Sequence, residues 1–409
     1  MIELQISYTT LLARYYKPIA PRTLAEGART GVAAELVARG ITGATLPYPR
    51  QATSVDAGSD YVDGIVLRSL ARYGARLDGH RLSEAAVAGE LAALRDPYTL
   101  LFRPPQFQKF NAFLGDEKFG GIGAVLSFDP AAGARVASVV PGGPAARAGL
   151  LPGDIIDRID SKVVRELGGQ GVRDALRGKI GAPVTVRFSR AGAARTLTIV
   201  RAEIRDPEVD ARRFDDVGYV RLDRFGDRAG KELGDALERL RGAGVRGFVL
   251  DLRANGGGYG DEATAVASAF IAHGTIFTTR ERTGAPVVAR ADGKAGKALP
   301  LAVLVDGDTA SAAEIVAGAV QDDGAGTIVG TRTFGKGVVQ SIFPLPDGSA
   351  RKVTTARYTT PSGRDIDKIG IEPDVVVAEP AGARRGDPAT DPQLAAALAT
   401  VRHVPSAPP

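Results

Sequence analysis

Cysteine is absent from all 409 residues of the chain. Its absence excludes disulfide bonds, thiol catalysis and cysteine-ligated metals, and it fits an exported protein as well as a cytosolic one. Histidine is scarce: His80, His273 and His403 are scattered, and none has neighbours typical of a metal site or a catalytic triad. No stretch reaches the roughly 18 consecutive apolar residues that a membrane-spanning helix requires.

Charge of one sign is not concentrated anywhere. The 52 Lys and Arg residues are interspersed with 47 Asp and Glu residues, so nucleic-acid or membrane-surface binding is not indicated. The N-terminus lacks the basic, apolar and small-residue regions of a signal peptide. We therefore expect either a cytosolic protein or a chain that begins after a removed leader. A hydrophobic content of 44% and this length predict two or three soluble globular domains.

Four regions follow one another along the chain. Residues 1–112 are rich in Ala, Leu and Arg and predict helices, whereas 113–203 show short β-like runs punctuated by Gly and Pro. Residues 204–378 alternate strand-like and helix-like segments, which is typical of a layered α/β core, and 379–409 predict a linker and tail with one short helix. The strands expected in the core are 218–222, 247–252 and 301–305, and the expected helices are 231–240, 261–272 and 312–321.

The helical region contains an internal echo at an offset of 58 residues. The tetrapeptide Leu-Ala-Arg-Tyr at 12–15 returns at 70–73, and Gly31 returns as Gly89. Two helical hairpins that arose by duplication would produce this pattern, although Ala-rich helices also match by chance.

A serine stands where a buried strand gives way to a helix. The apolar run 301–305 is followed by a polar break, and Ser311 begins the next helix. A serine on such a turn is exposed, and the unpaired N–H groups of the first helical turn can stabilise an oxyanion beside its hydroxyl. Ser311-x-x-Glu314 is equally a capping box, a common helix start. Taken alone, this segment favours a cap over a nucleophile.

A serine nucleophile needs a proton acceptor, and Lys336 is the candidate. It lies between two glycines that let the backbone approach other elements closely, and we expect apolar walls from Phe334, Val338 and Val339. In such surroundings the ammonium loses hydration, so the pKa of the lysine falls toward neutrality. Gln340 lies four residues on, where its amide can orient the amine by a hydrogen bond. Most glycine-flanked lysines are only solvated loop residues.

The same segment is also an incomplete Walker A sequence. Gly330-x-x-x-x-Gly335-Lys336 continues with Gly337 in place of the Ser or Thr that would hold Mg²⁺. Asp251 resembles a Walker B acid, but it precedes this segment, the reverse of the usual order. We interpret the match as coincidental, and nucleotide binding remains a third hypothesis.

Together these segments resemble the carboxy-terminal processing, or tail-specific, protease family. The resemblance rests on Ser311 in Thr-Ala-Ser-Ala-Ala-Glu, on Lys336 in Thr-Phe-Gly-Lys-Gly 25 residues later, and on Gln340. Residues 251–258 (Asp-Leu-Arg-Ala-Asn-Gly-Gly-Gly) resemble the family's strand–loop segment that contributes an oxyanion donor. By that alignment the donors are the backbone N–H groups of Gly257 and Ala312. Further motifs that resemble the family lie at 96–99, 360–363 and 370–374, so the likeness covers roughly residues 60–400.

The resemblance implies a PDZ domain inserted at 113–203. Residues 119–124 (Phe-Gly-Gly-Ile-Gly-Ala) are similar to a carboxylate-binding loop, whose successive N–H groups capture a peptide C-terminus while an adjacent strand accepts the peptide. By themselves these glycines indicate only a tight turn. The implied peptide-binding residues are Gly121, Ile122, Gly123 and Ala124 of the loop, and Val172 and Leu176 of the following helix.

The family resemblance implies an α/β multidomain fold with a helical N-terminal region, the PDZ insertion and a ClpP/crotonase-like protease core. It implies a serine endopeptidase that uses a Ser–Lys dyad and recognises apolar C-terminal tails of protein or peptide substrates, with no metal or organic cofactor. It also implies an exported bacterial protein of the periplasm or cell envelope, and it suggests a homodimer through the helical region. The alternative is a PDZ-based peptide-binding scaffold with a degenerate protease core.

Overall fold

The computed structural model describes residues 2–112, 114, 119–131, 133–140, 142–204 and 207–403. The chain forms two compact units: the first joins Met1–Phe110 to Glu208–Pro409, and the second is Asn111–Pro207. The second unit is thus inserted in the sequence of the first. In the described part of the chain, no helix is both long and apolar enough to cross a membrane.

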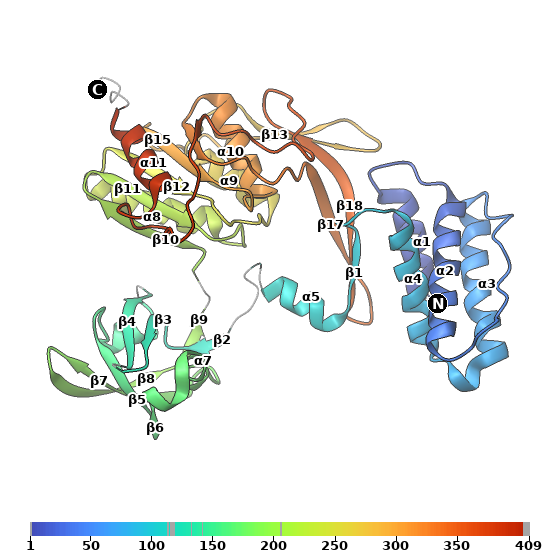
Figure 1. The fold of residues 1–409 in the computed structure, drawn as a ribbon, viewed down its shortest axis with the longest axis horizontal. Helices are drawn as coiled ribbons and strands as arrows, with labels where there is room; N and C mark the ends of the chain where they lie inside the picture. The colour runs from blue at the N-terminus through green and yellow to red at the C-terminus, as the bar shows by residue number, and fades with distance from the viewer. Residues whose placement is uncertain are drawn as a thin grey trace. The chain divides into compact units, whose positions relative to one another are not determined.

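Four helices form a bundle at the start of the first unit (Figure 1). They are α1 (Ile2–Arg14), α2 (Pro21–Ala38), α3 (Val55–Tyr73) and α4 (Gly79–Ala93), with the 3-10 turn η1 (Gly74–Arg76) between α3 and α4. Buried residues recur at helical spacing, as at Leu24, Ala28, Val32 and Leu36 of α2, so one face of that helix packs inward. The side chain of Ser54 caps α3, and that of Asp78 caps α4.

Helices α2 and α4 touch through glycine. A Cβ atom on Gly27 would lie 2.4 Å from the carbonyl oxygen of Gly89, and one on Gly31 would lie 1.8 Å from that of Ala85. Gly27 and Ala85 are 58 residues apart, as are Gly31 and Gly89, so the two contacts are related by the same offset as the sequence echo. The absence of side chains lets the helix backbones meet directly.

A five-stranded sheet follows the bundle in the first unit. It comprises β1 (Leu100–Phe102), β13 (Thr275–Glu281), β14 (Val287–Arg290), β17 (Val338–Pro344) and β18 (Ala350–Thr359), and helix α5 (Pro104–Asn111) follows β1. One face of β18 contacts the bundle: Val353 belongs to the bundle's core, and Arg351 donates to the carbonyl oxygen of Ile6. The opposite face carries Tyr358, whose hydroxyl donates to the carbonyl oxygen of Ser311 at 3.2 Å.

A six-stranded sheet forms the α/β core of the first unit. Its strands, in spatial order, are β10 (Val209–Phe214), β11 (Val217–Leu222), β12 (Gly247–Asp251), β15 (Leu301–Val305), β16 (Thr327–Gly330) and β19 (Val375–Val376). All neighbours run parallel except β10 and β11. The helices associated with it are α8 (Ala229–Gly242), α9 (Gly260–Ser268), α10 (Ala312–Asp323) and α11 (Pro392–His403).

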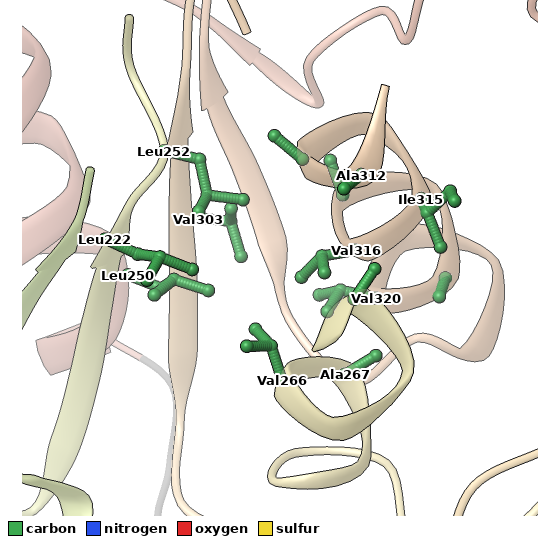
Figure 2. Packing of buried hydrophobic residues seen from close by; sticks show 14 of the residues in the cluster. Leu222, Leu250, Leu252, Val266, Ala267, Val303, Ala312, Ile315, Val316 and Val320 are labelled. Carbon is green, nitrogen blue, oxygen red and sulfur yellow. The ribbon is translucent and has the colours of Figure 1, made fainter. Parts of the chain in front are cut away.

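Helices cover both faces of this sheet, as a parallel sheet requires. On one face, Leu250 and Val303 pack against Val316 of α10 and Val266 of α9 (Figure 2). On the other face, Val249 and Leu304 pack in a second cluster with Leu394 and Leu398 of α11. The strands and helices predicted for 204–378 are confirmed, with shifts of a few residues at their ends.

The C-terminal segment is more firmly attached than a linker and tail. Helix α11 is part of the core, and its first turn is tied to the end of β12: Arg253 donates to Asp391 at 2.8 Å and also pairs with Asp251 at 2.6 Å. All three of these side chains are buried. The expected region 379–409 therefore contributes core structure as far as residue 403, and its last six residues lie outside the described residues.

The second unit is β-rich. Its strands are β2 (Phe119–Gly121), β3 (Ala124–Asp129), β4 (Gly133–Val139), β5 (Ile155–Ile159), β6 (Lys162–Val163), β7 (Pro183–Arg190), β8 (Ala193–Val200) and β9 (Ala202–Ile204), and its helices are α6 (Pro144–Ala148) and α7 (Val164–Leu176). The main sheet runs β3-β4-β5-β7-β8, and β2 pairs with β9. Helix α7 is broken at Gly168, whose φ of 66° is left-handed. Residue 113, the expected start of this region, lies outside the described residues.

Candidate active site and peptide-binding groove

Ser311 occupies the sharp turn between strand β15 and helix α10. Its φ of 59° and ψ of −116° lie in a region that residues other than glycine rarely adopt. Such strain costs on the order of 1–3 kcal/mol and is typical of functional turns, including the strand-to-helix turn that exposes a nucleophilic serine. The segment 306–310 and the buried helix behind it hold this conformation. The predicted strand–turn–helix setting of Ser311 is confirmed.

The candidate oxyanion donor Ala312 lies next to Ser311 in the chain. Ala312 is the first residue of α10, and in the described part of the chain no acceptor lies within hydrogen-bonding distance of its N–H. Free N–H groups at a helix start carry partial positive charge. This group is therefore available to an anion that forms beside Ser311.

The glycine loop after β12 differs from the expectation. The N–H of Gly257 donates to Oδ1 of Asn255 at 2.9 Å, so this N–H is not free to bind an oxyanion. Asn255 is fully buried, and its Nδ2 donates to the carbonyl oxygen of Leu222 at 2.7 Å. The family resemblance implied Gly257 from its place in the loop, but the side chain of Asn255 binds the N–H of that glycine.

Within the described part of the chain, the backbone N–H of Gly258 is free, unlike that of Gly257. It forms a parallel bridge with Phe225, in which the carbonyl of Gly257 and the N–H of Tyr259 point toward Phe225. Because successive peptide groups alternate in direction, the N–H of Gly258 points away from Phe225. It meets no acceptor among the described residues. The loop lies close to the serine turn, since a Cβ on Gly257 would be 2.9 Å from the nitrogen of Ala312.

Lys336 lies in a half-buried loop with a lowered pKa. Burial and, next, the charge of Lys352 lower its pKa to about 8, while Glu314 and Asp96 act in the opposite direction. Its Nζ lies 5.1 Å from the centroid of the Tyr98 ring, a cation–π distance. Phe334 was expected to wall this site, but 54% of it is exposed.

The glycines beside Lys336 allow the close approach that the sequence predicted. A Cβ on Gly335 would lie 2.8 Å from the nitrogen of Gly370, and one on Gly337 would lie 2.7 Å from that of Asp367. After Lys336 the chain enters strand β17. A Walker A lysine instead leads into a helix whose N-terminus holds phosphate, so this geometry does not fit a nucleotide site.

One buried carboxylate links the serine turn to the lysine loop. Glu314 of α10 is fully buried and accepts hydrogen bonds from the N–H groups of Ser311 at 2.9 Å, Gly335 at 2.6 Å and Lys336 at 2.9 Å. It also accepts from the hydroxyl of Thr333 at 2.6 Å. The sequence marked Glu314 only as a helix-capping residue. Its contacts to residues about twenty positions later carried no sequence signal.

Gln340 does not reach the lysine amine. Its Nε2 donates to the hydroxyl of Thr354 at 3.5 Å, at the limit of a hydrogen bond. In the part of the chain that the structure describes, Lys336 Nζ forms no hydrogen bond with Ser311 or Gln340. The fold thus brings the two loops together, and the side chains themselves are separated in this conformation.

The predicted peptide-binding residues line one groove in the second unit. The groove has a volume of about 300 Å³ and lies between β3 and α7. Gly123 has a left-handed φ of 72°, and the carbonyls of Ile122 and Gly123 accept hydrogen bonds from Ala145 and Val140. These bonds fix the loop that faces the groove. The predicted residues in its lining are Gly121, Ile122, Gly123, Ala124, Val172 and Leu176, joined by Leu126, Phe128 and Ile204 among others.

Comparison with known proteins agrees with both units. Residues 216–377 match Peptidase family S41, and residues 135–190 match the PDZ domain. A carboxy-terminal-processing protease from Bartonella bacilliformis is 39% identical over 315 residues, which is 74% of this chain and 71% of that protein. A carboxyl-terminal-processing protease from a Picosynechococcus species is 39% identical over 321 residues, 76% of this chain and 77% of the relative.

A solved structure resembles almost the whole chain. The photosystem II D1 C-terminal processing protease is 28% identical, with a TM-score of 0.50 over 92% of each chain. The likeness confirms the predicted fold class, with its N-terminal helices, PDZ region and α/β protease core. The chain belongs to peptidase family S41, among the carboxy-terminal-processing proteases.

Proposed function

We propose that the chain is a serine endopeptidase in which Ser311 is the nucleophile and Lys336 the general base. The observation that carries this proposal is the buried carboxylate of Glu314, which binds the backbones of both residues. Because one carboxylate binds both loops, the distance between the two backbones is fixed, as a catalytic pair requires. The lowered pKa of Lys336 provides an uncharged amine near neutral pH.

The reaction proceeds by acyl transfer. The neutral amine of Lys336 takes the hydroxyl proton of Ser311 while the serine oxygen bonds to the peptide carbonyl carbon. Lys336 must first swing from the Tyr98 ring toward the serine, a movement that substrate binding commonly brings about. The lysine then gives its proton to the leaving amine, the C–N bond breaks, and water hydrolyses the acyl ester by the same proton route.

We assign the oxyanion donors to the N–H groups of Ala312 and Gly258. Both lack an acceptor among the described residues, whereas Gly257 is engaged by Asn255. Donors that are positioned before the reaction stabilise the developing charge without reorganisation. Asn255 thus acts on the reaction indirectly, because its two hydrogen bonds hold the loop.

The test compares cleavage of an unfolded protein by the wild type, Ser311→Ala and Lys336→Met. We expect both variants to lose activity, and a serine-reactive probe to label the wild type but not Ser311→Ala. Activity in either variant would overturn the assignment. A wild type that binds peptides but neither cleaves nor reacts would instead favour the alternative, a peptide-binding scaffold with a degenerate core.

The groove between β3 and α7 supports recognition of C-terminal tails. An extended peptide adds beside β3, its carboxylate meets the loop 121–124, and its last side chain enters the apolar lining. We expect Ser311→Ala protein to bind a peptide ending in valine, and to bind its C-terminal amide at least tenfold more weakly. A second substitution, Leu126→Asp, should abolish binding, whereas Leu151→Asp at an exposed position should not. Equal binding of acid and amide would contradict tail recognition.

A further inference from the structure

Asp306 directly follows strand β15 and shapes the turn that presents Ser311. Its side chain is buried. The carboxylate oxygen Oδ1 accepts hydrogen bonds from the N–H of Asp308 at 3.0 Å and from that of Thr309 at 2.9 Å. An aspartate that accepts the backbone N–H groups of the next few residues fixes a tight turn. The carboxylate of Asp306 therefore sets the path of the chain from β15 to the serine.

The carboxylate of Asp306 also binds the loop after β12. The N–H of Ala254 donates to both of its oxygens, with distances of 3.0 Å to Oδ1 and 3.1 Å to Oδ2. Ala254 has a left-handed φ of 57°, a conformation that costs free energy and persists only where neighbouring groups hold it. The backbones are joined as well, because the N–H of Ala310 donates to the carbonyl oxygen of Asn255 at 2.9 Å. Asp306 thus connects the two segments that carry the proposed oxyanion donors.

Thr309 extends the contacts of Asp306 to the lysine loop. The hydroxyl of Thr309, which is fully buried, accepts a hydrogen bond from the N–H of Asp306 and donates one to the carbonyl oxygen of Leu252, each at 2.9 Å. The carbonyl oxygen of Thr309 accepts from the N–H of Phe334 at 3.0 Å. One hydrogen-bonded cluster around Asp306 therefore reaches the serine turn, the loop after β12 and the loop that carries Lys336.

Arg385 supplies a positive charge beside Asp306. One nitrogen of its guanidinium group lies 2.8 Å from Oδ2 of Asp306 and 2.6 Å from a carboxylate oxygen of Glu379. A buried carboxylate is stable when it is both paired and hydrogen-bonded, and Asp306 meets both conditions. Arg385 belongs to the segment between β19 and α11, where the sequence predicted only a linker. A residue from this C-terminal segment thus contacts the residue that forms the serine turn.

We propose that Asp306 is a positioning residue for the reaction: its carboxylate holds the serine turn and the loop after β12 in the arrangement that acyl transfer needs, and Arg385 holds the carboxylate. The inference rests on the proposed role of Ser311. The nucleophile and the oxyanion donors must be in place before the reaction, because donors that have to reorganise stabilise the transition state less. A disturbed arrangement therefore lowers kcat more than it raises KM.

The test is the steady-state kinetics of Asp306→Asn. The amide keeps the shape and one acceptor oxygen, but it has no charge, and its N–H₂ group meets either Arg385 or the backbone N–H groups. We expect kcat to fall about 100-fold, with KM within about threefold of the wild type. Arg385→Gln should lower kcat about tenfold. The double variant should be no slower than Asp306→Asn, because Arg385 acts through Asp306.

The control is Arg402→Gln, which changes an exposed arginine of α11 that also pairs with carboxylates and should leave kcat unchanged. Thermal unfolding shows whether each variant is folded, and Arg385→Gln carries the test if Asp306→Asn does not fold. A wild-type kcat in either folded variant, or a loss confined to KM, overturns the inference while Ser311→Ala remains inactive. Losses that multiply in the double variant overturn the role of Arg385. Activity in Ser311→Ala would overturn the proposed function itself.

Discussion

The backbone N–H of Ser311 donates a hydrogen bond to the carboxylate of Glu314 at 2.9 Å. The same carboxylate binds the N–H groups of Gly335 and Lys336. The residue that caps helix α10 therefore also connects the serine turn to the lysine loop. Because Glu314 is fully buried, its removal leaves these buried N–H groups without their acceptor.

Substitution of Glu314 should separate stability from catalysis. We expect Glu314→Ala to destabilise the core by about 3–5 kcal/mol, since buried donors lose their acceptor. Glu314→Gln keeps one acceptor oxygen and preserves the shape, but its amide N–H₂ faces the donors. We expect this variant to fold and to lose about 100-fold in kcat through misplacement of the loops. The control is Glu238→Gln, which changes an exposed residue of α8, and a wild-type kcat in Glu314→Gln would contradict the proposal.

The cleavage rate should rise with pH through the pKa of Lys336. That pKa is lowered to about 8, so at pH 7 only about a tenth of the molecules carry the uncharged amine. We expect kcat/KM to increase about tenfold per unit below pH 8 and to level off above it. The measurement is a pH–rate profile with a peptide that has no titrating groups in this range. A plateau reached below pH 6.5 would identify another group as the base.

Removal of the Lys336 ammonium should stabilise the protein. The pKa falls from 10.5 in the unfolded chain to about 8 in the fold, so the folded state disfavours the proton that the unfolded state binds. This difference costs about 3 kcal/mol at pH 7. The cost decreases as pH rises from 8 and is gone above 10.5, where both states are uncharged. Lys336→Met should therefore gain stability in denaturant unfolding at pH 7, and the gain should shrink at pH 10.

Denaturant unfolding of Lys294→Met at pH 7 and pH 10 is the control for the stability gain expected of Lys336→Met. Lys294 is exposed, so its removal should change stability by less than about 0.5 kcal/mol at either pH. If Lys336→Met were destabilised at pH 7, packing of the lysine stem would outweigh the desolvation of its amine.

Neighbouring glycines of the loop after β12 should respond differently to alanine. A Cβ on Gly258 would lie 2.1 Å from the carbonyl oxygen of Phe225, whereas a Cβ on Gly256 meets nothing within 4 Å. Gly258 also has a φ of 153°, which only glycine adopts easily. We expect Gly258→Ala to lower kcat by about 100-fold or more with little change in KM, because it moves an oxyanion donor. Gly256→Ala should remain within about threefold of wild type, and equal loss in both would contradict the assignment of Gly258.

The attachment of the C-terminal helix depends on a buried ion pair. Asp391 is fully buried, so Asp391→Ala removes one of the two carboxylates that pair with buried Arg253 and should cost about 3–5 kcal/mol. Asp235→Ala removes an exposed partner of Lys231 and should cost less than about 1 kcal/mol. Denaturant unfolding of the two variants provides the comparison. Similar small losses in both would show that α11 contributes little to the core.

The core elements were predictable because their signals are local. Strand β15 is a run of five buried apolar residues, and α10 follows it with a capping pattern, so the position of Ser311 could be read from neighbouring residues. The 25-residue step to Lys336 added specificity that neither residue had alone. The lining of the peptide groove was predictable for the same reason, since loop 119–124 has a recognisable glycine pattern.

Other features depend on contacts between distant residues. Nothing near Gly257 in the sequence indicates that Asn255 takes its N–H, because an asparagine before glycine fits many loops. The sequence predicted that Phe334 would pack against Lys336, but the side chain of Phe334 is exposed to solvent. The lysine instead faces Tyr98, more than two hundred residues earlier in the chain.

The sequence by itself determined the main elements of the core and the family, and it singled out the candidate reactive residues, because periodicity and spacing are properties of neighbouring positions. Tertiary structure decided which groups surround those residues. Glu314 joins two loops, and Tyr98, from the segment before β1, lies beneath the amine of Lys336. Burial and charge at a site are sums over neighbours in space, so the basicity of Lys336 and the available oxyanion donors emerge only when the chain has folded.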